Sequence, residues 1–337
     1  MKEVFPGIFL IKEVRKFLKF IESTNVYVIA GPDGLIYDGG YGTKRLVNSV
    51  INEVQKIKEL YQYKNERINL TRILPSHSHS DHISGLSKLR KALGVKIVVT
   101  KDMANIIRDK QRYAYAYRSD SYRDYFIINS GLKRKLKSYL LSKLSNFFWN
   151  LISGISFVKD PDEIIDDNTE ILINDETWKI FPSPGHSFDH ISLYNEEKGI
   201  LFTGDNLFKS ISGWLGPPES NLDDYMKTLE IYSNLKNLKL ILPAHGEPIE
   251  NPKERINEII LHRENRNKQV FDLINEFRDE GITSKQIINK IYTNGRNIIK
   301  QIARGWVSLT LKKLEAEYHI YRKESKKEIR FFPVNKL

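Results

Sequence analysis

The sequence predicts a layered α/β domain that carries a helical insert and a C-terminal unit of its own. Three observations predict this class: short apolar runs typical of strands, segments of helical periodicity between them, and Gly- or Pro-rich turns where the runs end. A chain of 337 residues accommodates one large domain with an appendage. We expect the large domain over 1–250, its insert at about 104–156, and the C-terminal unit over 251–337.

The predicted strands are short runs that favour β-branched and aromatic residues and stop at turn residues. They cover 26–30, 35–38, 68–74, 96–100, 169–173, 178–181, 191–194, 200–203 and 238–242. The turn from Gly31 to Gly34 joins the first two as a hairpin. Apolar residues at helical spacing predict helices over 44–62, about 83–92 and 222–234, and Asn221 is the expected N-cap of the last one.

The insert at about 104–156 is predicted to be mostly helical. Aromatic and cationic residues alternate between Arg112 and Tyr125, and an apolar stripe with intervening lysines follows over 132–151. This composition suits stacking on nucleic-acid bases, a lid over an acyl substrate, an anchor on a membrane surface, or a packing surface. The sequence leaves these four alternatives open.

The C-terminal unit is predicted to begin with a helix near residue 252. A short helix capped by Thr283 or Ser284, a long helix, and two short strands near 318–322 and 328–332 follow. This order resembles a winged helix in which the strand pair forms the wing. Such a unit is compatible with contact to a phosphate backbone, and equally with a structural cap or a dimer surface.

The composition excludes several classes of site. The chain contains no cysteine, so it has no disulfides, thiolate metal sites or cysteine nucleophile, and any metal must be held by His, Asp or Glu. No apolar run approaches the ~20 residues of a membrane span, and the first residues lack the pattern of a secretion signal. We therefore expect a cytoplasmic location.

The net charge of +11 is unevenly spread along the chain. Residues 101–160 hold 12 Lys/Arg against 5 Asp/Glu, a net charge of +7, and residues 251–337 hold 19 against 11, a net charge of +8. The remainder is mildly acidic, at −4. The basic regions can attract phosphates or an anionic surface, but a lysine-rich solvated surface accounts for the same counts.

A dense group of metal-ligand side chains follows the predicted strand at 68–74. The segment contains three histidines and one aspartate within six residues, namely His77, His79, Asp81 and His82. At an extended strand end, residues two apart share a face, and the next two can turn toward a neighbouring point. Imidazole and carboxylate ligands suit Zn, Mn or Fe. The pattern predicts a site for two metal ions side by side.

Three later segments each place a further ligand type just past a predicted strand. His186 lies in a Pro-Gly-His-Ser segment, Asp205 ends a Thr-Gly-Asp segment, and His245 lies in a Pro-Ala-His-Gly segment. The flanking Gly and Pro permit tight turns there. Strand ends that gather at one rim of a sheet are an ordinary location for an active site.

These four segments, taken in order, resemble the metallo-β-lactamase superfamily over about residues 4–250. The resemblance implies an αββα sandwich with two metals at one edge between its sheets. It implies three sets of ligands, which are His77, His79 and His186 for the first metal, Asp81, His82 and His245 for the second, and Asp205 between them. Zinc is the expected metal, with Mn or Fe as alternatives. Asp81 and Asp205 are the expected catalytic residues, because Asp81 would orient the attacking hydroxide.

The same resemblance disfavours some branches of the superfamily. Flavodiiron oxidoreductases have an acid where His79 stands, and zinc β-lactamases typically have a cysteine where Asp205 stands. The second motif-bearing domain of β-CASP nucleases is not found. With its C-terminal unit, the chain resembles the β-lactamase-like proteins that carry a winged helix, one of which is a mitochondrial endoribonuclease acting on single-stranded RNA.

We therefore expect a dinuclear metallohydrolase whose substrate is either a phosphodiester of single-stranded nucleic acid or a small ester, thioester or lactone. The alternatives are a nucleic-acid-binding regulator that works through the winged helix, and a peripheral lipid hydrolase. A homo-oligomer is compatible with the sequence, and a membrane surface is not an expected partner. His190 is open between a place behind the ligands, a substrate contact and a structural role, and His262 and His319 are expected to be structural or exposed.

Overall fold

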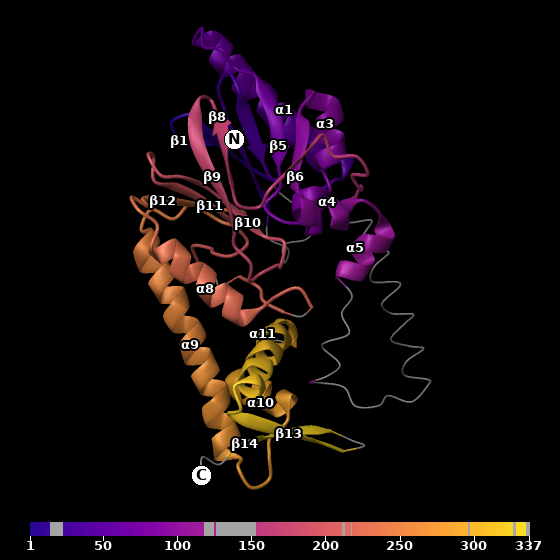
Figure 1. Cartoon of the computed structure of the whole chain (residues 1–337), viewed down its shortest axis with the longest axis vertical. Helices are drawn as coiled ribbons and strands as arrows, with labels where there is room; N and C mark the ends of the chain where they lie inside the picture. The colour runs from indigo at the N-terminus through magenta and orange to yellow at the C-terminus, as the bar shows by residue number, and fades with distance from the viewer. Residues whose placement is uncertain are drawn as a thin grey trace.

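The computed structural model describes most of the chain as two sheets between layers of helix, with a C-terminal unit below them (Figure 1). The described residues are 1–13, 23–117, 125, 153–210, 213–216, 218–295, 297–325 and 328–334. Most of the predicted insert, including the apolar stripe at 132–151, lies outside them. The structure therefore does not address the membrane-anchor interpretation of that stripe.

The first sheet has seven strands whose spatial order equals their order in the chain. They are β1 (Lys2–Phe5), β2 (Ile8–Lys12), β3 (Asn25–Ile29), β4 (Gly34–Tyr37), β5 (Leu70–Leu74), β6 (Lys96–Thr100) and β7 (Glu163–Ile165). The strands from β1 to β4 pair antiparallel, and those from β4 to β7 pair parallel. Parallel neighbours need long crossovers, which is why helices lie between these later strands in the chain.

The second sheet has five strands in the order β12-β11-β10-β9-β8. They are β8 (Thr169–Ile173), β9 (Glu176–Pro182), β10 (Ile191–Asn195), β11 (Ile200–Gly204) and β12 (Leu240–Pro243). Only β11 and β12 pair parallel, and the crossover between them is α8 (Leu222–Ser233). Three strands of this sheet, β9, β11 and β12, carry the later ligand segments at their carboxyl ends.

Helices cover the outer faces of both sheets, which completes the expected αββα order (Figure 1). The helices beside the first sheet are α1 (Lys44–Tyr63), α2 (Ser80–Ile83), α3 (Leu86–Leu93), α4 (Lys101–Ile107) and α5 (Lys110–Ala116). Helix α1 buries an apolar stripe at helical spacing that includes Val47, Val50 and Val54. The expected N-cap of α8 is confirmed, since the Asn221 side chain accepts hydrogen bonds from two backbone amides of its first turn.

Aromatic side chains fill the space between the two sheets. Phe202 of β11 is fully buried, and its ring centroid lies 5.2 Å from that of Tyr27, 5.0 Å from that of Tyr37 and 5.8 Å from that of Trp178. Two of these rings come from the first sheet and two from the second. The contact therefore joins the sheets directly.

The C-terminal unit consists of α9 (Pro252–Glu276), α10 (Ser284–Ile291), α11 (Asn297–Ala316), β13 (Ile320–Glu324) and β14 (Ile329–Pro333). This is the predicted order of elements, and Thr283 caps α10 in a capping box with Gln286. Ile282 adds a single antiparallel bridge to Phe331 of β14. The unit has an apolar core of its own, and α9 and α11 also pack on α8 of the large domain.

Several elements were not predicted from the sequence. They are β1, β2, β7 and α2, whereas α5 and most of α4 fall within the insert that the sequence predicts to be mostly helical. The predicted helix at 83–92 is instead one turn, α2, followed by α3. Among the described residues, every helix is too short or too polar to span a bilayer.

Replacing Phe202 by Ala is expected to lower the free energy of unfolding by about 3–5 kcal/mol, because it leaves a cavity between the two sheets. Leu172→Ala on β8 is the matched control, since Leu172 is 57% exposed and its loss should change stability by about 0.5 kcal/mol or less. Denaturant unfolding with a chelator present measures both, so that bound metal does not contribute. Equal losses in the two variants would contradict this assignment of the core.

Candidate metal centre

The strands of both sheets deliver the predicted ligands to one edge of the sandwich. His77 and His79 follow β5, and the single turn of α2 carries Asp81 and His82. The other three come from the second sheet and follow β9, β11 and β12, namely His186, Asp205 and His245. Residues from distant parts of the chain thus meet at one place.

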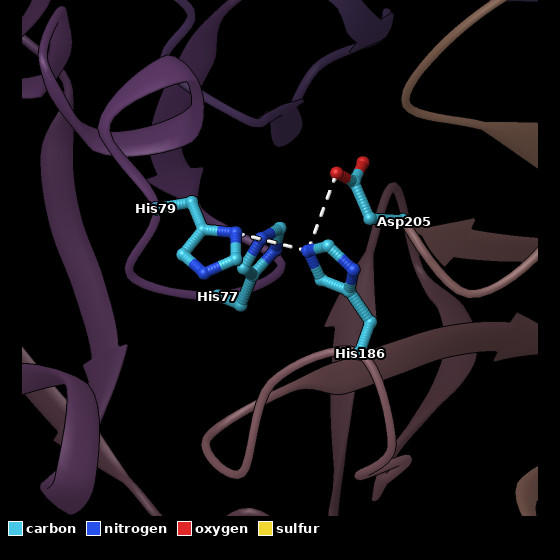
Figure 2. Close-up of side chains that lie close together, drawn as sticks. All are labelled: His77, His79, His186 and Asp205. Carbon is cyan, nitrogen blue, oxygen red and sulfur yellow. Dashed lines mark hydrogen bonds and ion pairs between the residues drawn. The ribbon is translucent and has the colours of Figure 1, made fainter. Parts of the chain in front are cut away.

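The first group of ligand types contains His77, His79, His186 and Asp205, whose ligand atoms all lie within 4.8 Å of one another (Figure 2). His186 Nε2 lies 2.9 Å from His79 Nδ1 and 3.5 Å from Asp205 Oδ2. Four side chains that aim nitrogen and oxygen lone pairs at one point can hold a divalent cation.

The second group contains Asp81, His82, Asp205 and His245, again within 4.8 Å. Asp205 Oδ1 lies 3.5 Å from His82 Nε2 and 3.3 Å from His245 Nε2. Asp81 Oδ2 lies 3.3 Å from His245 Nε2. Asp205 belongs to both groups and turns one carboxylate oxygen toward each, so the seven predicted side chains form two adjoining groups that could each hold a cation.

The inward-facing atoms of this cluster fit a metal site because several have no hydrogen-bond partner. His77 Nε2, His82 Nε2 and Asp205 Oδ1 are buried and make no hydrogen bond, although the last two face each other at 3.5 Å. A buried polar atom without a partner costs free energy, roughly 1–3 kcal/mol. Two of these atoms follow β5 and one follows β11, and all three are aimed at the cluster, where a bound cation would satisfy them. Imidazole with carboxylate is a donor set that divalent metals accept.

The outer nitrogens of the histidines are held by protein acceptors. His82 Nδ1 lies 3.1 Å from Asp38 Oδ2, His186 Nδ1 lies 2.8 Å from the Trp214 carbonyl oxygen, and His245 Nδ1 lies 3.1 Å from that of Ser23. His77 Nδ1 contacts Ser76 Oγ at 3.0 Å. An acceptor at Nδ1 keeps the proton there and leaves the lone pair of Nε2 facing the cluster.

Burial keeps three of the histidines neutral. It lowers the pKa of His77 well below its usual value, lowers that of His79 to about 3, and lowers that of His186. A neutral imidazole is the form that binds a metal. The three histidines of the first group are therefore ready as ligands at neutral pH.

The second group is electrostatically different because it contains more carboxylates. Burial alone would lower the pKa of His82, but nearby carboxylates, led by Asp38, raise it well above its usual value. Burial likewise opposes the shift at His245, where Asp205 raises the pKa. Without metal, these imidazolium groups compensate the buried carboxylates, a role that a bound cation would take over.

His190 lies behind the cluster and holds the Asp205 loop. It is buried, its Nε2 accepts a hydrogen bond of 3.2 Å from the Asp205 amide, and its Nδ1 lies 2.8 Å from Ser183 Oγ. Gly204 precedes Asp205 with φ +48°, and a Cβ there would collide with the His190 ring. Of the alternatives open from the sequence, the geometry favours the place behind the ligands.

Sequence reasoning missed two acidic residues beside the cluster. Asp38 is buried and accepts from the Ser76 amide at 2.7 Å in addition to its contact with His82. It directly follows β4 and precedes Gly39-Gly40, the same signal of a strand end and a glycine turn that marked the other segments. Glu219 Oε1 lies 3.8 Å from His79 Nε2, and no comparable pattern in the sequence marked it.

The described start of the insert packs against the first group. The Tyr117 ring lies 5.1 Å from that of His79 and 4.8 Å from that of Tyr113. Tyr115 of the same helix is 80% exposed, and Tyr125 packs on the C-terminal unit. Among the aromatics of this segment that the structure describes, Tyr117, Tyr115 and Tyr125 therefore lie in different surroundings. His262 and His319 are exposed and lie outside the cluster.

Comparison with known proteins finds matches over the large domain. Residues 21–245 match the family model of the metallo-beta-lactamase superfamily. A beta-lactamase-like protein 2 homolog of Caenorhabditis elegans is 34% identical over 150 residues, which are 44% of this chain and 48% of that protein. A lactamase-like protein of Aspergillus niger is 29% identical over 200 residues, 54% of this chain and 61% of that one. The chain thus spans about half the length of the curated relatives it matches.

Solved structures share the fold over nearly the whole chain. A metallo-beta-lactamase family protein of Thermus thermophilus has a TM-score of 0.69 at 18% identity and covers 98% of this chain and 99% of its own. A beta-lactamase domain protein of Burkholderia ambifaria has a TM-score of 0.72 at 17% identity, with 99% and 93% covered. With two thirds of its length matched to the family model and the paired ligand groups in place, this chain belongs to the metallo-beta-lactamase superfamily.

Proposed function

We propose that the protein is a dinuclear metal-dependent hydrolase. The observation that carries the proposal is the pair of ligand groups that share Asp205, with unpaired buried atoms aimed into them. The first metal would be held by His77, His79 and His186, the second by Asp81, His82 and His245, and Asp205 would serve both. Zinc is the proposed metal, because neutral imidazole and carboxylate without thiolate suit it, and Mn or Fe are the alternatives.

Two metals in such a site activate water at neutral pH and stabilise the negative charge that develops on the substrate. The protein's own residues position this chemistry. Asp205 fixes the separation of the two sites through its two oxygens. Asp81 and His79 have the most exposed side chains of the seven, each 17%, so the substrate approaches from their side. Asp81 is placed there to orient the attacking water through a hydrogen bond.

Two classes of substrate fit the proposed hydrolase. The C-terminal unit and the basic charge of residues 251–337 support a phosphodiester of single-stranded nucleic acid. The compact set of ligands, with no second nuclease domain expected from the sequence, supports a small ester, thioester or lactone. The regulator hypothesis gains no support from α11, because its middle is buried against the large domain and is not free to enter a groove of a nucleic acid.

A hydrolysis panel tests the proposal and separates the alternatives. We expect zinc-loaded protein to contain about two metals per chain and to cleave either a single-stranded RNA oligonucleotide and a generic phosphodiester, or a thioester and a lactone. Elemental analysis gives the metal content, and product formation gives the turnover. Protein that binds no metal and turns over no member of the panel would rule the hydrolase out.

Asp205→Ala is expected to lose metal and activity together, since the substitution removes a ligand from both sites. Metal content should fall well below that of the wild-type protein, and hydrolysis should fall by at least about 100-fold, as expected when a metal that activates water is lost. Asp166→Ala is the control, because Asp166 is exposed on the turn between β7 and β8 and lies outside both ligand groups. Near-normal metal content in Asp205→Ala would show that the ligand assignment is wrong.

Removing the metals is expected to lower the melting temperature. A ligand that binds only the folded state stabilises it by about 2.7 kcal/mol at 100 times its Kd. Thermal unfolding of the zinc-loaded protein with and without a chelator measures the shift. In Asp205→Ala the same chelator should change the melting temperature far less, and an equal shift in both proteins would argue for a metal site elsewhere.

A further inference from the structure

One backbone carbonyl outside the large domain's sheets determines how His186 points. The Trp214 carbonyl oxygen accepts a hydrogen bond of 2.8 Å from His186 Nδ1, while His186 Nε2 faces the first group. The Trp214 ring stands edge-on to the imidazole, with the centroids 6.3 Å apart. Because Nδ1 holds its proton only while that carbonyl stays in place, residues 213–216 set the orientation and tautomer of this ligand.

The C-terminal unit contacts residues 213–216 through two of its helices. Arg263 of α9 is only 4% exposed, and its Nη2 donates a hydrogen bond of 2.7 Å to the Gly213 carbonyl oxygen. Gly305 of α11 faces the next residues, where a Cβ would collide with the Leu215 carbonyl oxygen and lie 3.1 Å from Gly216 Cα. The two helices therefore touch the residues on both sides of Trp214.

Arg263 and Gly305 each cost free energy locally, one as a buried charge and the other as a glycine within a helix. Their contacts with residues 213–216 account for their presence. A buried guanidinium needs partners, and that of Arg263 has the Gly213 carbonyl and the Tyr225 ring, whose centroid is 5.4 Å away. Glycine inside a helix destabilises it by about 1 kcal/mol relative to alanine. At Gly305 it lets α11 approach closer than any side chain would allow.

The Tyr225 side chain links Arg263 to the loop that carries Asp205. The Arg263 guanidinium lies over the Tyr225 ring, and the Tyr225 hydroxyl donates a hydrogen bond of 2.7 Å to the Asn206 carbonyl oxygen. The Asn206 side chain in turn accepts a bond of 3.3 Å from the His186 amide. Packing of Arg263 on Tyr225 thus bears on two neighbouring ligands of the first group.

We propose that the C-terminal unit is a positioning element of the first metal site, acting on His186 through residues 213–216 by way of Arg263 and Gly305. The inference rests on the proposed function, in that His186 must hold a metal. It assigns α9 and α11 a role at the metal site whatever substrate the enzyme takes. Leu309, further along α11, packs with α8 residues in the same apolar cluster, so the unit is seated on the large domain along this whole side.

Arg263→Met tests the proposal, because methionine keeps an apolar stem over Tyr225 but cannot donate to Gly213. Zinc affinity at the first site should fall about tenfold, the low end expected for a residue behind a metal ligand. The second site lacks His186 and meets residues 213–216 only through the shared Asp205, whose backbone lies against Gly213, so its affinity should fall less than that of the first site. Titrating the metal-free protein with zinc against a competing chelator measures the zinc affinity of both sites. At a chelator concentration that still leaves the wild-type protein with about two metals per chain, the variant should retain about one.

Arg266→Met is the matched control on the same helix. Arg266 stacks within the C-terminal unit, 5.2 Å from the Tyr292 ring centroid and 5.5 Å from that of Trp306, and its Nη1 donates a hydrogen bond to Gln269 of the same helix. Its replacement should weaken the C-terminal unit without changing zinc affinity. The melting temperature of each metal-free variant reports the purely structural effect separately.

Gly305→Ala provides a second, independent test that does not weaken the helix. Alanine favours α11 by about 1 kcal/mol locally, yet its Cβ displaces the helix from Leu215. It should lower first-site affinity as Arg263→Met does. Arg263→Lys, which keeps a cationic donor for the Gly213 carbonyl, should recover part of the affinity.

Unchanged zinc affinity in both Arg263→Met and Gly305→Ala would overturn the inference and leave the proposed function intact. Equal loss at both sites, matched by Arg266→Met, would overturn it as general destabilisation. The wild-type titration is the separate test of the proposed function, since wild-type protein that binds no zinc would remove the metal site itself.

Discussion

The two sheets must pack with the ends of their ligand-bearing strands side by side, and the candidate metal centre depends on this constraint. Hydrogen bonds between the sheets fix the closure at the site's edge. The Tyr27 hydroxyl and the Asn25 side chain each donate a bond of 2.8 Å to the Pro243 carbonyl oxygen, just before the loop that carries His245. The Ile191 amide donates a bond of 2.9 Å to the Ser76 carbonyl oxygen, next to His77. A shift of either sheet would separate the two halves of the ligand set.

The concentration of polar groups at this edge explains why the surroundings are so extensively hydrogen-bonded. Burial lowers the pKa of His77, His79 and His186, whereas nearby carboxylates raise the pKa of His82 and His245, and all five lie in a region with little access to water. Buried charges are stable only when paired. Asp38, Ser76 and His190 contact the outward-facing atoms, while His77 Nε2, His82 Nε2 and Asp205 Oδ1 face inward without a hydrogen bond. A bound cation would satisfy these three atoms.

The packing of the C-terminal unit gives the molecule a second link between distant parts of the chain. A free nucleic-acid-binding module would expose the face of its long helix. In this structure the middle of α11 faces the large domain, and Lys313 pairs with Asp223 at the start of α8. Arg263 and Lys313 are engaged with the large domain, while others such as Lys285 and Lys312 are exposed, so a role in substrate binding would have to use the exposed ones.

The sequence by itself determined the class of the fold, most strands, and the seven side chains that the structure gathers into two candidate ligand groups. Each of those signals is local: a strand run, a turn residue, and a ligand type at the strand's end. Asp38 carried the same local signal of a strand end before a glycine turn, but it belongs to none of the four motif segments and was overlooked. The strands β1 and β2 were missed as well, because their short runs are recognised as strands only when β3 pairs with them.

Only the tertiary structure decided which side chains stand behind the ligands and how the C-terminal unit is attached. Glu219 beside His79, the Trp214 carbonyl at His186, and the contact of Arg263 with Gly213 join residues far apart in the chain. No periodicity or spacing encodes such pairs, because they follow from the closure of two sheets and the docking of two helices. Local patterns name the ligands, whereas long-range packing fixes the direction in which each of them points.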